Sequence, residues 1–281
     1  MYPVFQNQSF QKQFERKGYV LLSSLLSDAE VKELYDLFER FPSQYSAPFH
    51  TTHFSADISY KKQVHDTIAS VVFPKLKPYL NRFVPLFGNF MIKNAGAQTS
   101  MDLHADWTYV DEQRHSSAAV WIPLIDVNEE NGCLGVIEGS HKVTNSIRGP
   151  MIRQSSRQKE EDWAKGYGKL IPMSAGGAIV YDHRLLHYSP SNKTTKVRPA
   201  LNLSMAPESA TWLHYCFPEG AEAIELYSVP DSDFFMRYNN FQRPETGSLI
   251  KTLPTDSVEY IDARMKNFWK TSMLNKIRQL F

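Results

Sequence analysis

The sequence predicts a mainly β fold, a sandwich or barrel of short strands with helices on either side. From about residue 83 to residue 207, short apolar segments alternate with turn-forming residues, which is typical of such folds. Segments with the spacing of amphipathic helices flank this region, at about residues 27–80 and near the C-terminus. The chain has 281 residues, of which 42% are hydrophobic, and this suffices for one large core. We therefore expect a single domain over residues 1–281.

Two helices are expected before the β region. The stretch SDAEVKELYDLFERFP starts with a capping box of Ser27 and Glu30, continues with apolar residues at helical spacing and stops at Pro42. A second helix is expected through VHDTIASVVFPKLKPYL, with a break or kink at Pro74. A short strand is expected to start at Tyr19, ahead of the first helix.

The β core itself is expected from six segments, FGNFMIKN, AAVWIPLIDV, GCLGVIEG, KLIPM, AIVYDH and ALNLSMAP. Beyond them, SVEYIDARMKNFWKTSMLNKIRQLF again has helical spacing, whereas residues 217–256 predict no clear element. We expect this C-terminal extension, residues 217–281, to cover a pocket mouth, to form a homodimer contact or simply to pack on the β core. A lid or a dimer contact would bury Phe234, Phe235 and Tyr238.

The composition argues against several classes of protein. Lys and Arg number 31 and Asp and Glu number 30, so the formal charge of +1 gives no reason to expect nucleic acid or a membrane surface as a partner. The two cysteines, Cys133 and Cys216, exclude a disulfide scaffold and argue against a cysteine-based zinc site. The sequence shows neither a signal peptide nor an apolar run of membrane-spanning length, so the expected location is the cytoplasm.

The stretch LHADW places an imidazole and a carboxylate two residues apart, at His104 and Asp106. Residues i and i+2 of a strand point to the same face, so both side chains would reach the same space. They supply two thirds of a 2-His-1-carboxylate triad, a ligand set that suits Fe(II) and leaves coordination positions open. The spacing is common by chance, and from this pair alone an exposed or hydrogen-bonded pair on a strand is the better explanation.

The stretch AGGAIVYDHRLLHYSPSNKTTKVRPALNL offers two candidates for the third ligand, His183 and His187. It also places Arg198 in an apolar strand, where a guanidinium is costly unless it meets an anion. The planar fork of arginine matches a carboxylate, so Arg198 indicates a carboxylate-bearing cosubstrate. An internal salt bridge or an arginine that reaches solvent at the strand edge is the alternative.

Three motifs in order resemble the Fe(II)/2-oxoglutarate-dependent oxygenases of the phytanoyl-CoA dioxygenase group. They are LHADW, AVWIPLIDVNEENGCLGVIEGSHK and GGAIVYDHRLLHYSPSNKTTKVRPALNL, and the N-terminal F-x-x-x-G-Y-V is similar too. The resemblance covers about residues 14–207, with a departure at Glu138, where the family usually has proline. It implies a double-stranded β-helix, a cupin-like jelly-roll core.

The resemblance also assigns residues. His104 and Asp106 match the first two iron ligands, and His187 matches the third because Ser189 and Arg198 follow it at the family's spacing. His183 lacks both features and is expected in a loop or behind the ligands. Arg198 matches the residue that grips the distal carboxylate of 2-oxoglutarate. Four further residues are expected to line the cosubstrate pocket, Ser189, Trp121, Gln98 and Asn202. The remaining histidines receive no metal role, and His141 is expected to fix a loop. His50 and His53 are expected on a surface loop, with a place near the substrate as the alternative.

The implied cofactors are Fe(II), 2-oxoglutarate and O2. The implied reaction is hydroxylation of an unactivated C–H in a small organic substrate, coupled to decarboxylation of 2-oxoglutarate to succinate and CO2. Relatives that halogenate have a small residue in place of the carboxylate, so Asp106 favours oxygenation, while desaturation and cyclisation stay open. A non-catalytic binding module would have a broken triad or no Arg198, a cupin-like iron dioxygenase would not need Arg198, and a zinc hydrolase would need a separate base.

Overall fold

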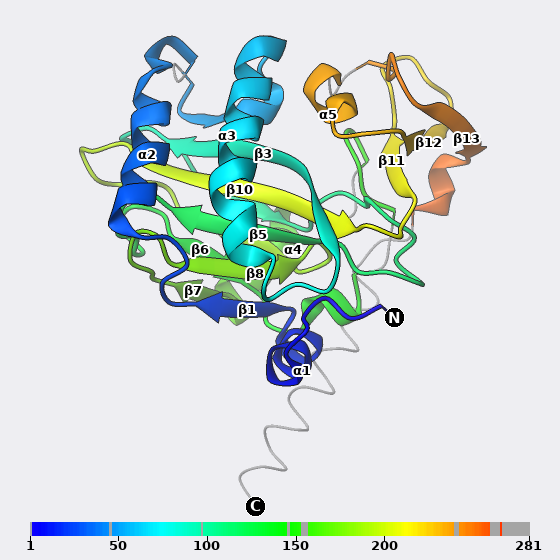
Figure 1. Cartoon of the computed structure of the whole chain (residues 1–281). Coiled ribbons are helices and arrows are strands. Elements are labelled where there is room, and N and C mark those ends of the chain that lie inside the picture. The colour runs from blue at the N-terminus through cyan, green and yellow to red at the C-terminus, as the bar shows by residue number, and fades with distance from the viewer. Residues whose placement is uncertain are drawn as a thin grey trace, which may run out of the picture.

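A computed structural model describes residues 2–44, 47–96, 98–144, 147–152, 157–238, 242–258 and residue 265. A six-stranded antiparallel sheet and a four-stranded antiparallel sheet form the centre (Figure 1). The six-stranded sheet has the order β1 (Tyr19–Leu22), β8 (Ala178–Asp182), β5 (Ala118–Pro123), β10 (Arg198–Pro207), β3 (Phe83–Lys93) and β2 (Phe49–Thr51). The four-stranded sheet has the order β4 (Met101–His104), β9 (His187–Ser189), β6 (Leu134–Val136) and β7 (Lys169–Ile171).

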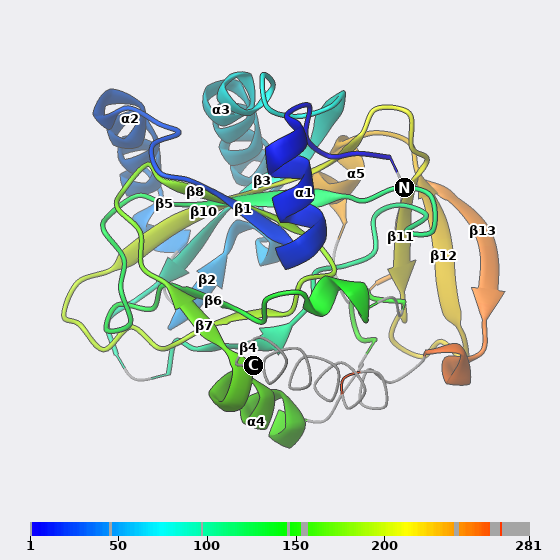
Figure 2. The ribbon, with the colours of Figure 1, turned by 90° about the horizontal axis from the view of Figure 1, so that it is seen from below.

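Both faces of the six-stranded sheet are covered, because successive side chains of a strand point to opposite faces. In β5, Val120 and Ile122 join an apolar cluster with three helices, which are α1 (Gln8–Lys17), α2 (Asp28–Glu39) and α3 (Ile58–Leu76). Ala119 and Trp121 of the same strand join a second cluster with Leu134 and other residues of the four-stranded sheet. Figure 2 shows α2 and α3 on one side of the large sheet and the small sheet on the other. The predicted jelly-roll class is confirmed.

The first predicted helix is confirmed with its cap, whereas the second differs in extent. The Oγ of Ser27 accepts from the backbone N–H of Glu30, and the Glu30 carboxylate accepts from the backbone N–H of Ser27. Helix α3 begins earlier than expected, after the N-cap Asp57, whose side chain accepts from the Tyr60 N–H. It runs through Pro74 to Leu76. The expected break at Pro74 is therefore wrong, and the proline lies in the last turn of the helix.

All six expected segments contain a strand, but the patterns missed several elements. Helix α1 has few apolar residues and buries only Phe14, so it lacks the run of spaced apolar residues from which helices are predicted. It ends at Gly18, whose φ of +86° favours glycine and where a Cβ would lie 2.6 Å from Nδ1 of His141. Helix α4 (Arg157–Tyr167) also escaped prediction. In the part of the chain that the structure describes, no helix is long and apolar enough to cross a lipid bilayer.

A separate three-stranded sheet accounts for much of the C-terminal extension. Its strands are β11 (Trp212–Cys216), β12 (Ile224–Val229) and β13 (Ser248–Leu253), with the short helix α5 (Asp233–Arg237) between the last two. Phe234, Phe235 and Tyr238 are buried within this chain, where they pack with Leu86 and Phe87 of β3. These contacts are with the β core, and the lid and the homodimer contact stay predictions. The helix expected over the last residues lies outside the described residues except at Met265, which is buried.

Candidate metal centre

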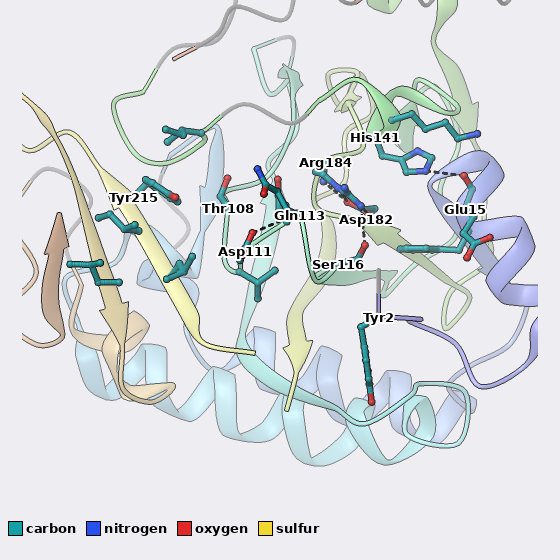
Figure 3. A pocket seen from close by; sticks show the side chains of 18 of the residues that line it. Tyr2, Glu15, Thr108, Asp111, Gln113, Ser116, His141, Asp182, Arg184 and Tyr215 are labelled. Carbon is teal, nitrogen blue, oxygen red and sulfur yellow. Dashed lines mark hydrogen bonds and ion pairs between the residues drawn. The ribbon is translucent and has the colours of Figure 1, made fainter. Parts of the chain in front are cut away.

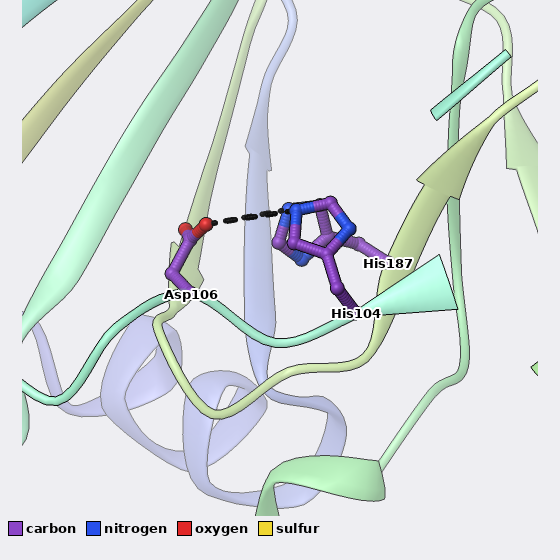
Figure 4. Close-up of side chains that lie close together, drawn as sticks. All are labelled: His104, Asp106 and His187. Carbon is purple, nitrogen blue, oxygen red and sulfur yellow. Dashed lines mark ion pairs between the residues drawn. The ribbon is translucent and has the colours of Figure 1, made fainter. Parts of the chain in front are cut away.

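His104, Asp106 and His187 converge on one point, although they come from two strands and a loop. His104 ends β4 and is the Cα partner of His187, which begins β9. Asp106 follows β4 and does not belong to it, so the expectation that one strand holds both residues is wrong. Oδ1 of Asp106 still lies 3.9 Å from Nε2 of His104 and 3.7 Å from Nε2 of His187 (Figure 4). Within the described residues, this is the one group of three potential metal ligands.

Hydrogen bonds to backbone carbonyls fix the tautomer of both histidines. Nδ1 of His104 lies 2.7 Å from the carbonyl oxygen of Asp102, and Nδ1 of His187 lies 2.9 Å from that of Leu185. A carbonyl oxygen only accepts, so each Nδ1 carries the hydrogen and each Nε2 presents a lone pair to the shared point. Burial, followed by the charge of His104, lowers the pKa of His187 to about 4. His187 is therefore neutral near pH 7, the state in which imidazole binds a metal.

The carboxylate of Asp106 is held from behind by a short chain of donors. The Tyr181 hydroxyl donates to Oδ2 of Asp106 over 3.0 Å, and Nδ2 of Asn202 donates to that hydroxyl over 3.0 Å. Burial alone would raise the pKa of Asp106. The imidazoles around the carboxylate and the Tyr181 hydrogen bond outweigh it and lower the pKa. Asp106 is therefore ionised and fixed in orientation, as a metal ligand must be.

The backbone at Asp106 is fixed by a buried arginine that sequence patterns did not indicate. Nε of Arg148 donates to the carbonyl oxygen of Asp106 over 2.6 Å. The same guanidinium pairs with the carboxylate of Glu112, with Nη1 at 3.0 Å from Oε2. Arg148 is 1% exposed, so this buried ion pair anchors the loop that carries Asp106.

His183, the other candidate for the third ligand, belongs to a different hydrogen-bond network. Its Nδ1 lies 2.8 Å from the Ser117 hydroxyl and its Nε2 lies 3.3 Å from the Ser204 hydroxyl. Both ring nitrogens are therefore occupied, and His183 is fully buried behind the triad. The structure thus brings His187 and not His183 to the point that the other two ligands share.

Arg198 lies next to the triad with its charge unmatched. It is 2% exposed, and Nη1 donates to the carbonyl oxygen of Met91 over 3.0 Å. Nε is buried without a partner, and no carboxylate pairs with the guanidinium in the described part of the chain. Burial lowers the pKa of Arg198 to about 9, so it is protonated at pH 7. A buried, unpaired cation of this kind favours an anion.

A small cavity joins Arg198 to the triad, and we call it the cosubstrate cavity. Of the residues expected there, Ser189 and Trp121 line it together with Arg198, His104 and His187. The Trp121 ring lies 5.8 Å from the guanidinium carbon of Arg198. The remaining two expected residues lie elsewhere. Gln98 is exposed and lines neither cavity beside the triad, and Asn202 lines the neighbouring cavity described next.

That neighbouring cavity is open to solvent and rich in aromatic side chains, and we call it the aromatic cavity. His104 lines both cavities, and Asp106 and Asn202 line the aromatic one. The remaining residues that define it are Phe49, Thr51, His53, Phe54, Phe87, Asn89, Met91, Met101, Ala105, Trp107, Tyr109 and Ser204. His53 was expected on a surface loop, but its ring lies 4.9 Å from that of Trp107 at the cavity wall.

Lys93, beside Arg198, was not predicted from the sequence, whereas the role of His141 was. Lys93, the Cα partner of Arg198 across β3 and β10, is fully buried and donates from Nζ to the carbonyl oxygens of Ser189, at 3.0 Å, and Pro190. Sequence patterns missed Lys93, although a lysine at the end of an apolar strand is a signal of a buried cation. Nε2 of His141 lies 3.1 Å from the carbonyl oxygen of Glu15, so His141 fixes its loop to α1, as expected.

A third cavity, larger than the two beside the triad, lies away from the triad and shares no residue with them (Figure 3). Tyr2, Glu15 and Tyr215 are among the residues that line it. Its buried charges, Asp182 and Arg184, pair with each other at 2.6 Å. Because these charges are matched, the cavity offers no unsatisfied ion comparable to Arg198.

Comparison with known proteins agrees with this geometry. Residues 14–200 match the family model described as phytanoyl-CoA dioxygenase. A phytanoyl-CoA dioxygenase of Arabidopsis thaliana is 31% identical over 150 residues, which cover 50% of this chain and 51% of that protein. The chain thus spans about half the length of this curated relative.

Solved structures resemble the fold at low sequence identity. The epimerase SnoN, solved with Fe3+, alpha-ketoglutarate (2-oxoglutarate) and nogalamycin RO, is 16% identical with a TM-score of 0.54 over 73% of this chain and 85% of its own. HygX of Streptomyces hygroscopicus, solved with nickel and 2-oxoglutarate bound, is 14% identical with a TM-score of 0.54 over 72% and 88%. Likenesses at this identity show a shared fold.

Proposed function

Because the chain belongs to the phytanoyl-CoA dioxygenase family, we propose that it is an Fe(II)- and 2-oxoglutarate-dependent dioxygenase. It would hydroxylate, or otherwise oxidise, an unactivated C–H of a small organic substrate. The single observation that carries the proposal is the placement of a buried, unpaired Arg198 in one small cavity with His104 and His187. A metal site alone would not need this cation, whereas a dicarboxylate cosubstrate would.

The residues present fit both groups. Two imidazole Nε2 atoms and one carboxylate oxygen form the donor set that suits Fe(II), and His104, Asp106 and His187 would hold it. The guanidinium of Arg198 would bind the distal carboxylate of 2-oxoglutarate, a charge-assisted contact that arginine makes well. The Ser189 side chain, 7% exposed in the same cavity, offers a further donor.

Iron with 2-oxoglutarate would supply oxidation of a C–H bond by O2, coupled to the loss of CO2 and the formation of succinate. The chain's own residues would position the reactants and keep water away. Asp106 would contribute the carboxylate ligand in the place that a halide would need, and this favours oxygenation over halogenation. Tyr181 and Arg148 keep Asp106 in place, and the aromatic cavity would hold the substrate beside the triad.

The alternatives fit the site less well. A non-catalytic module has no need of three intact ligands with fixed tautomers, and a cupin-like dioxygenase without 2-oxoglutarate leaves Arg198 without a use. A zinc hydrolase would need a separate general base beside the metal. Among the described residues, the carboxylate of Asp106 cannot serve as that base, because it already belongs to the ligand set.

The test is anaerobic addition of Fe(II) and 2-oxoglutarate to the purified metal-free protein, followed by visible spectroscopy. We expect the weak metal-to-ligand charge-transfer band of bound 2-oxoglutarate. Arg198→Ala should abolish or weaken the band while iron still binds, and the exposed Arg82→Ala is its matched control. His187→Ala should abolish iron binding, whereas His183→Gln should retain it. Iron binding without a band in the unsubstituted protein would contradict the use of 2-oxoglutarate.

A further inference from the structure

The aromatic cavity carries an inference about the class of substrate, which rests on the proposed function. We propose that the substrate is a neutral organic molecule with a flat ring body and at least one O–H or N–H group. We further propose that Oδ1 of Asn202 accepts the hydrogen bond from that group. Three observations lead there, namely the charge of the cavity lining, its ring geometry and the orientation of one buried amide.

The lining of the aromatic cavity offers no lysine or arginine to a charged substrate. Among the described residues that define it, none is lysine or arginine. Recognition of a phosphate or of a phosphate-rich carrier depends on such side chains, because charge-assisted bonds offset the loss of hydration. The nearby Lys61 is buried and donates from Nζ to the carbonyl oxygen of Tyr238 over 3.1 Å. The cavity therefore favours a neutral molecule over a CoA thioester.

The walls of the cavity favour a flat ring. The His53 ring lies 4.9 Å from that of Trp107 with 71° between the planes, and 5.1 Å from that of Phe87 with 32° between the planes. Phe54, which is 64% exposed, extends this aromatic surface toward solvent. Aromatic side chains bind other rings through stacked and edge-to-face contacts beyond simple burial. A ring substrate would thus cover the apolar surface that the cavity exposes.

The orientation of the Asn202 amide follows from the donor chain behind Asp106. An ionised carboxylate only accepts, so the Tyr181 hydroxyl donates its single hydrogen to Oδ2 of Asp106. The Tyr181 oxygen must therefore accept from Asn202, which places Nδ2 on that side of the amide. Oδ1 consequently faces the other way, where it is buried without a partner among the described residues.

In this proposal, the unsatisfied oxygen is the polar anchor for a substrate in the aromatic cavity. Asn202 is 7% exposed, so water satisfies its Oδ1 poorly, and a buried acceptor without a partner is unfavourable. Asn202 lines the aromatic cavity together with His104 and Asp106. A substrate that donates to Oδ1 is thereby held in the compartment that the triad also lines.

Three probes that share one ring system test the proposal by calorimetric titration into the metal-free protein at pH 7. They are 2-naphthol, which is neutral and donates a hydrogen bond, 2-methoxynaphthalene, which cannot donate, and 2-naphthyl phosphate, which is charged. We expect 2-naphthol to bind at least tenfold more tightly than the phosphate. We also expect Asn202→Ala to weaken 2-naphthol by roughly tenfold, and 2-methoxynaphthalene by less than about twofold.

Trp107→Ala should weaken both neutral probes, and Trp163→Ala, in α4 and outside the cavity, is its matched control. Phosphate binding as tight as that of 2-naphthol would overturn the proposal, and this comparison needs no variant. An equal loss for both neutral probes in a folded Asn202→Ala protein would overturn the role of Asn202. Because the probes need no iron, their failure beside an intact charge-transfer band would sink this inference alone. Probe binding without that band would support the ligand class and contradict the oxygenase function.

Discussion

The Tyr181 hydroxyl holds one oxygen of Asp106 while the other oxygen faces two imidazoles. Oδ2 accepts from Tyr181 over 3.0 Å, and Oδ1 lies within 3.9 Å of Nε2 of both His104 and His187. The two oxygens of one carboxylate thus have separate partners. A hydrogen bond to the outer oxygen fixes the carboxylate rotamer, so that the inner oxygen is presented where a metal would bind.

Removing this hydroxyl should weaken metal binding without removing a ligand. We expect Tyr181→Phe to lower the affinity for Fe(II) by about 10- to 100-fold, the usual effect of losing a partner behind a metal ligand. Tyr19→Phe is the matched control, because Tyr19 is the Cα partner of Tyr181 across β1 and β8 and its hydroxyl donates to Glu138. The measurement is anaerobic competition for Fe(II) against a chelator. Equal affinities in the two variants would show that Tyr181 does not tune the site.

Sequence patterns indicated His104, Asp106 and Arg198 because each lies in a local motif whose residue types are unusual for their setting, whereas the choice of His187 over His183 came from the family resemblance. The histidine and carboxylate of LHADW are adjacent in sequence, and an arginine inside an apolar strand stands out. The patterns could not place Asp106 outside β4, because strand ends depend on partner strands and His104 is the last residue paired with β9. That placement did not matter for the ligand set, since the loop backbone is held by Arg148.

The residues that sequence patterns missed act through pairing between distant strands. Tyr181 reaches Asp106 from β8 of the six-stranded sheet, and Lys93 lies opposite Arg198 only because β3 and β10 pair in that register. No local spacing encodes such contacts. The three-stranded C-terminal sheet was missed for a different reason. Strand β13 has no buried residue, so it lacks the apolar alternation from which strands are predicted.

The buried pair of Arg148 and Glu112 should matter for both stability and the metal site. Arg148→Met leaves the Glu112 carboxylate buried without its cation and frees the Asp106 carbonyl, so we expect a loss of about 3–5 kcal/mol in the free energy of unfolding. The double variant Arg148→Met/Glu112→Gln should recover part of it, because the uncompensated charge is gone. Denaturant titration measures both. A single variant as stable as the unsubstituted protein would contradict this account.

His214 should make the protein less stable in acid. It is 1% exposed among aromatic rings, and burial, followed by the charge of His53, lowers its pKa to about 3. Between that value and the ordinary pKa of about 6.5, the unfolded chain binds a proton that the folded chain does not. Stability is therefore complete above about pH 6.5 and falls on acidification, by about 1.4 kcal/mol per pH unit for this one group.

Replacing His214 by Leu removes the titrating group from both states. We expect the variant to show a shallower loss of unfolding free energy from pH 6.5 to pH 4 than the unsubstituted protein, with denaturant midpoints as the measure. His115→Leu is a control on the same type of side chain in another part of the fold. A slope that is unchanged in His214→Leu would mean that other groups cause the acid sensitivity.

Lys93 should support the cosubstrate cavity mainly by holding its wall. Its Nζ donates to the carbonyl oxygens of Ser189 and Pro190, which follow His187 in the chain. Lys93→Met would keep the apolar stem but leave both carbonyls without their donor, so we expect a loss of about 1–3 kcal/mol in the free energy of unfolding. The affinity for 2-oxoglutarate, read from the charge-transfer band, should fall less than in Arg198→Ala, because Arg198 itself remains.

The exposed Lys193→Met, in the same loop, should change stability by no more than about 0.5 kcal/mol. If Lys93→Met bound 2-oxoglutarate as poorly as Arg198→Ala, Lys93 would instead belong to the anion-binding set.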